Sequence, residues 1–247
     1  MMKKLFIIAL AVLMTAGIAS IALANGLGAG IVGSPHDFTD DVVAGVSTPG
    51  MEVGATGWNQ REEICRVCHV PHDHGRATQY YLNGLLWNHA VSEATYTMYD
   101  NTWSETLEGA QSAQPDGVAK LCLGCHDGTV GVDVYDRYAG GAVFMSDYNG
   151  GFEVPRFLDG TNQDLTGTHP LSITYDNVAD PGLKDPAATA MGLSGVINDV
   201  LDNGKVQCSS CHDVHDQESV AGTHLLRVAN NLGTGSASGL CLTCHIK

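Results

Sequence analysis

The sequence predicts a mostly irregular fold, with short helices and little β structure, wrapped around bulky groups other than its own side chains. The chain has 247 residues, is rich in Gly, Asn, Asp, Ser and Thr, and is only 6% aromatic. A chain of this length can normally bury a large core, yet few of its apolar stretches are long and periodic. In addition, all eight cysteines lie in one repeated pattern.

That pattern is C-x-x-C-H, found as CRVCH, CLGCH, CSSCH and CLTCH. It is typical of covalent haem attachment: the two sulfurs bond to the porphyrin, and the histidine that follows ligates the iron. We expect four haem c groups, attached at Cys65, Cys68, Cys122, Cys125, Cys208, Cys211, Cys241 and Cys244. The expected proximal iron ligands are His69, His126, His212 and His245.

Three other uses of the cysteines fit less well. Four disulfides are possible in an exported chain, but they give no reason for a histidine after every second cysteine. A zinc site made from two C-x-x-C pairs leaves the histidines unexplained. A redox dithiol would occur once, near a βαβ pattern that is not visible here. The sequence therefore predicts a multihaem cytochrome c with a row of four haems.

Residues 1–24 are typical of a secretory signal peptide. Lys3 and Lys4 precede an apolar run that ends in the cleavage pattern Ala22-Leu23-Ala24. A permanent membrane anchor is the alternative, because the run is nearly long enough to span a bilayer. We expect cleavage before Asn25 and a mature protein without a membrane segment, located outside the cell or at its surface, with the periplasm as the alternative.

The formal net charge is −15 and becomes more negative once Lys3 and Lys4 are removed. Nucleic-acid binding needs a basic face, so we expect no nucleic-acid partner. Such acidity favours solubility.

The chain also repeats internally. We expect one tetrahaem domain over 25–247, with halves at roughly 25–135 and 164–247 and an irregular excursion at 136–163. Each half has an isolated histidine, then a CxxCHxxH element, then an LCLxCH element. Two extra histidines per half is the number needed for bis-histidine ligation of four irons. The expected distal ligands are His36, His72, His169 and His215.

The remaining candidate ligands do not recur in both halves. Methionine is the competing axial ligand, but the four methionines after the signal peptide lie in settings that do not repeat. His74, His89 and His224 also have no counterpart. Of these, His89 in LLWNHAV is the best substitute if one assignment fails.

In the repeated CxxCHxxH element, the two histidines are expected to ligate different irons. His69 lies beneath the iron whose porphyrin is bonded to Cys65 and Cys68. His72 lies three residues further on, on the same side of that porphyrin, and must ligate a different iron. The same holds for His215, so we expect each element to tie two haems together.

The segments SPHDFT, REEICRVCHVPHD, LLWNHAV, KLCLGCHDGTV, HPLSITYD, LKDP, CSSCHDVHD and LCLTCHIK together resemble the doubled-CxxCH multihaem cytochromes. Within them the chain is most similar to the tetrahaem type that forms extracellular filaments in Geobacter. The resemblance implies bis-histidine haems in a continuous row and subunits stacked head to tail. It also implies that one axial histidine can come from a neighbouring subunit, and His36 on its N-terminal arm is our candidate.

The resulting functional prediction is long-range electron transfer by a filament subunit, or nanowire, with itself and other redox cytochromes or extracellular acceptors as partners. A monomeric periplasmic electron carrier is the first alternative. A multihaem reductase is the second and needs an iron with an open position. Seven histidines besides the proximal four can close all four irons, so we expect no enzyme activity.

Overall fold

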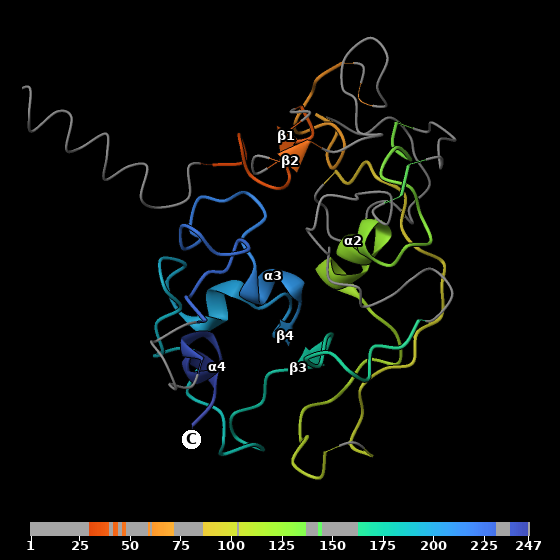
Figure 1. Cartoon of the computed structure of the whole chain (residues 1–247). Helices are drawn as coiled ribbons and strands as arrows, with labels where there is room; N and C mark the ends of the chain where they lie inside the picture. The colour runs from red at the N-terminus through yellow and green to blue at the C-terminus, as the bar shows by residue number, and fades with distance from the viewer. Residues whose placement is uncertain are drawn as a thin grey trace, which may run out of the picture.

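The computed structural model describes residues 30–39, 42–43, 46–47, 59, 61–71, 86–102, 104–136, 143–144, 163–230 and 238–246. This part of the chain is mostly coil, with short helices and little sheet (Figure 1). The coarse fold prediction is thus confirmed. Residues 1–24, His72, His74 and most of the 136–163 excursion lie outside the described residues.

The described α-helices are built on the attachment motifs. Helix α2 (Gly117–His126) contains CLGCH, α3 (Cys208–Cys211) contains the CSSC turn, and α4 (Gly239–Cys244) contains CLTC. Helix α2 is the longest because the Ala, Lys and Leu residues of GVAKLCL favour helix and three of its side chains are buried. The equivalent stretch before the first motif, REEIC, forms turns instead of a helix.

Two short antiparallel pairs provide the described sheet. Strand β1 (Val42–Val43) pairs with β2 (Val46–Ser47), and β3 (Ile173–Thr174) pairs with β4 (Lys205–Val206). The first pair lies at the top of Figure 1, and the second lies near the centre of the molecule. The β3–β4 pair brings residues that follow the excursion next to the CSSCH motif.

The segment 180–204 is mostly irregular and contains the 3-10 turn η4 (Ile197–Val200). Gly192 and Gly195 just before it have positive φ angles of 57° and 82°, a conformation that a right-handed helix cannot include. The helical turn is therefore short.

The apolar core of the described residues consists of small clusters. One contains Phe38, Val67 and Val132, and another contains Tyr96, Leu123 and Leu165. Cys68 and Cys125 from two different motifs pack against the first cluster.

Polar contacts join the two halves next to the motifs. Asp202 accepts a hydrogen bond from the Val118 amide, at 3.0 Å, and so caps the start of α2 from the other half. Asp116 binds Lys205 at 2.5 Å and accepts a hydrogen bond from Gln207 at 2.9 Å. These contacts hold α2 against α3. Within the described residues, no helix is long and apolar enough to cross a membrane.

Candidate haem sites

Each attachment motif closes one helical turn. His69, His212 and His245 donate their amides to the carbonyls of the first cysteine in their motifs, at 2.7, 3.0 and 2.9 Å. The fourth motif lies inside α2, which continues through His126. One turn of helix brings residues three and four apart onto one face. The local fold therefore gathers both sulfurs and the imidazole of each motif.

The cysteines form no disulfides. All eight lie in the described residues and all are free. Burial raises the pKa of Cys68 to about 12 and that of Cys211 to about 11. Contact with Cys122, followed by burial, raises the pKa of Cys208 well above its usual value. Redox-active dithiols need a lowered thiol pKa, so the dithiol alternative loses support.

The histidines meet in pairs. The ring centres of His36 and His126 are 6.2 Å apart, those of His69 and His215 are 6.3 Å apart, and those of His169 and His245 are 6.3 Å apart. Each pair joins one expected proximal ligand to one expected distal ligand. The first and third pairs lie within one half, whereas His69 and His215 come from different halves.

These separations fit a metal held between two imidazoles. An imidazole nitrogen binds a first-row metal such as zinc at about 2.0–2.1 Å, and the ring centre lies about 1.2 Å behind it, so two rings across one metal have centres about 6.4–6.6 Å apart, close to the separations seen here. Aromatic rings in direct contact also reach such distances. A contact of that kind would not select a CxxCH histidine in every pair.

Hydrogen bonds orient two of the imidazoles. The Nδ1 atom of His212 lies 2.8 Å from the His224 carbonyl, and that of His169 lies 3.0 Å from the Pro170 carbonyl. A backbone acceptor at one ring nitrogen fixes the tautomer and leaves the other nitrogen for a metal. The Nδ1 atom of His36 is buried without a partner.

Burial keeps the first pair neutral. It lowers the pKa of both His36 and His126 to about 4, with the neighbouring histidines as further causes. Both rings are therefore uncharged at neutral pH, which is the form that binds iron.

The remaining proximal histidine is His212, and the remaining expected distal ligand, His72, lies outside the described residues. His89, the substitute candidate, is fully buried. Its Nδ1 and Nε2 atoms lie 2.7 and 3.1 Å from the carbonyls of Ala90 and Gly131. Both nitrogens thus face the main chain, and the structure brings His89 next to the Cys125 sulfur, at 3.4 Å, rather than to another imidazole.

The main chain at Ala90 approaches α2 closely, and this explains the glycine, Gly124, in CLGCH. A Cβ atom on Gly124 would lie 2.6 Å from the Ala90 carbonyl oxygen. The segment that follows LLWNH therefore packs directly onto α2, and only glycine fits between the two cysteines at this point.

The sequence did not show how the chain returns to each CxxCH motif. In the first half Val70 donates its amide to Leu86, at 3.0 Å, and Asn88 donates its amide to Cys68, at 2.8 Å.

The same pair of bonds occurs in the second half. Asp213 donates to Leu225 at 2.8 Å, and Arg227 donates to Cys211 at 2.9 Å. The return segments, 86–88 and 225–227, are therefore structurally equivalent.

Among the described residues, no three side chains of His, Cys, Asp or Glu converge to hold one metal ion. A metal ion held between two of these imidazoles would have to bring its remaining ligands with it, as haem iron does. Comparison of the chain with family models and with curated proteins gives no match.

Proposed function

We propose that this protein is a tetrahaem c-type cytochrome that transfers electrons over long distances as the subunit of an extracellular filament. The observation that carries the proposal is the set of three histidine pairs with ring centres 6.2 to 6.3 Å apart. Each contains the histidine of a CxxCH motif. The filament and the extracellular location rest on the resemblance given above and on the expected signal peptide.

The chain's own residues would attach the haems, ligate the irons and exclude substrates from them. Cys65, Cys68 and the equivalent cysteines would attach the porphyrins, and His69 with its equivalents would supply one ligand to each iron. His36, His215, His169 and, by the repeat, His72 would supply the second ligands. Haem supplies reversible one-electron chemistry at iron. Two imidazoles on each iron leave no position for a substrate, which favours electron transfer over catalysis.

The pairs also bear on assembly. His36 was the candidate for ligation of a neighbouring subunit, but it lies beside His126 of its own chain. This arrangement gives no support to that candidate. A heterologous interface that does not close produces an open filament, and the N-terminal arm can take part in such contacts without donating a ligand.

The test begins with the secreted protein, and its haem content is measured by mass and by absorbance. We expect four haems per chain, all low-spin, with no carbon monoxide binding after reduction. Midpoint potentials should lie below the range of Met/His cytochromes, because methionine ligation raises the potential. A high-spin haem that binds carbon monoxide would favour the reductase instead.

Negative-stain imaging of the same material then separates the two electron-transfer functions. Filaments with a regular subunit repeat support the proposal. Monodisperse single chains that carry four low-spin haems would instead identify a soluble periplasmic carrier.

A further inference from the structure

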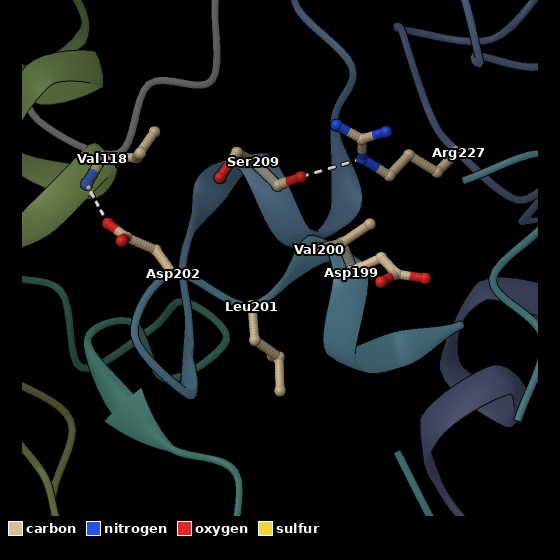
Figure 2. Close-up of a pocket in the computed structure, with 7 residues that line it drawn as sticks. All are labelled: Val118, Asp199, Val200, Leu201, Asp202, Ser209 and Arg227. Carbon is tan, nitrogen blue, oxygen red and sulfur yellow. Dashed lines mark hydrogen bonds between the residues drawn. The ribbon is translucent and has the colours of Figure 1, made fainter. Parts of the chain in front are cut away.

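Arg227 contacts two functional segments at once. Its Nε atom donates to the Ser209 carbonyl at 2.9 Å, within the Cys208–Cys211 turn (Figure 2). Its Nη1 atom donates to Glu218 and to Ser194, both at 2.7 Å. The side chain is only 13% exposed. This guanidinium therefore links the attachment turn to the segment that follows it.

That segment is organised by a second nearly buried charge, Asp213. Its carboxylate accepts the amides of His215 at 3.2 Å and of Gln217 and Glu218 at 2.7 Å each. The Arg227 Nη2 atom lies 3.9 Å from this carboxylate. A buried carboxylate without a counter-charge is strongly unfavourable, so Arg227 stabilises the wrapped form of the loop that carries His215.

We propose that Arg227 is a positioning residue for two haem sites. It braces the turn that attaches haem at Cys208 and Cys211, and through Asp213 and Glu218 it directs His215 to the iron bound by His69. This inference rests on the proposed function, because it assumes that the His69–His215 pair holds an iron. Loss of Arg227 therefore opens a site whose own attachment motif lies in the other half.

In the first half, the residue equivalent to Arg227 can brace the attachment turn without forming a charged link to the loop that follows. Asn88 occupies the position equivalent to Arg227, and its side chain donates to the Arg66 carbonyl, which is equivalent to that of Ser209. Val70 stands where Asp213 stands in the second half. Asparagine at this position can brace the turn, but Val70 offers no carboxylate where Asp213 accepts the amides of the ligand loop in the second half.

The test compares Arg227→Met, which loses both roles at similar volume, with Arg227→Asn, which keeps only the amide donor used in the first half. Wild-type protein should bind no carbon monoxide when reduced. We expect each reduced variant to bind about one carbon monoxide molecule per chain, and added imidazole should prevent this binding. Arg227→Asn should keep all four covalent haems, and amide exchange at Gln217 and Glu218 should become faster in both variants.

Arg66→Met is the matched control, because Arg66 also lies in an attachment turn and pairs with an aspartate, Asp136, and its printed ion pairs among the described residues are with Glu63 and Asp136 and not with a segment that carries a distal histidine. It should bind no carbon monoxide.

If Arg227→Met yields no haem-loaded protein, Arg227→Asn and Asp213→Asn decide the question. Unchanged midpoint potentials and no carbon monoxide binding in those variants would overturn the inference. Carbon monoxide binding by the wild type would instead count against the proposed function.

Discussion

The two halves of the molecule hold equivalent attachment turns with the same backbone bonds and with different side chains. In the first half Val70 and Asn88 flank the turn of Cys65 and Cys68, and Asn88 bonds to the turn and to Asp136. In the second half the equivalent residues are Asp213 and Arg227, which form a charged cluster with Glu218. The backbone geometry is thus common to both halves, whereas a charged pair occupies these two positions in the second half and an apolar and an amide side chain occupy them in the first.

The difference extends to the second motif of each half. CLGCH is followed by Asp127, which is fully buried and bonded to Tyr96 and Thr129. CLTCH is followed by Ile246, which is 57% exposed. A buried carboxylate therefore follows the second motif of the first half, as Asp127, and the first motif of the second half, as Asp213.

The largest expected effect comes from removing a distal histidine. His215→Ala and His36→Ala should each leave about one haem per chain five-coordinate, because one axial bond is lost. Carbon monoxide binding to the reduced protein counts these haems.

The Cys65→Ser/Cys68→Ser background shows whether His215 serves the other half. There His215→Ala should open no further site, whereas His36→Ala should still open one. An additional open site with His215→Ala in this background would contradict the cross-half pairing.

Tyr96→Phe should have the next largest effect. Tyr96 donates to Asp127 at 2.5 Å, and leaving a buried acceptor with fewer partners costs about 1–3 kcal/mol. Denaturant unfolding measures the loss. Ile246→Ser is the comparison in the second half, because Ile246 follows CLTCH as Asp127 follows CLGCH. Since Ile246 is exposed, its substitution should change the free energy of unfolding by no more than about 0.5 kcal/mol.

The effect of Tyr96→Phe should also depend on pH. Burial, followed by the bond to Asp127, raises the pKa of Tyr96. A raised pKa means that the stabilisation is fully present below the ordinary tyrosine value of about 10 and is lost as the pH rises above it. The difference between wild type and Tyr96→Phe should therefore shrink in strongly alkaline solution; a difference that grows there would contradict this linkage.

A smaller effect is expected from Asp116→Asn, which weakens the contact between the halves. Lys205, with Ser112, Gln207 and Ser172, holds the pKa of Asp116 below its usual value in spite of burial. Because both charged side chains are partly exposed, solvent screening limits the loss at neutral pH to about 0.5–1 kcal/mol. The pKa is lowered, so this stabilisation is present above pH 3.8 and is lost as the pH falls below it. Unfolding measured at pH 7 and at pH 3 should show a larger difference at pH 7 than at pH 3.

The smallest effect is expected from Glu63→Gln. Glu63 lies 3.3 Å from Arg66, and its side chain is 46% exposed. An exposed ion pair contributes less than about 1 kcal/mol, and Arg66 keeps its partner Asp136. Stability and haem content should stay at the wild-type level, in contrast to the Arg227 variants.

The sequence predicted the mostly irregular fold because its residues form few periodic apolar stretches, and the CxxCH motifs identified the candidate sites. The repeat selected His36, His169 and His215, which the structure brings beside proximal histidines. The role of His72 stays a prediction.

The return segments could not be predicted in the same way. The equivalence of 86–88 and 225–227 rests on backbone bonds and not on side-chain identity, and the loops before them differ in length. The braces made by Asn88 and Arg227 follow from that arrangement and carry no sequence signature.

On the proposed ligation, the pairing of His69 with His215 sets an order of assembly. A chain is synthesised from its N-terminus, so the CRVCH motif is complete long before residue 215 exists. Closing a contact between residues so far apart in sequence is entropically costly and slow. The proposed first site would therefore gain its second ligand only after the second half has been synthesised.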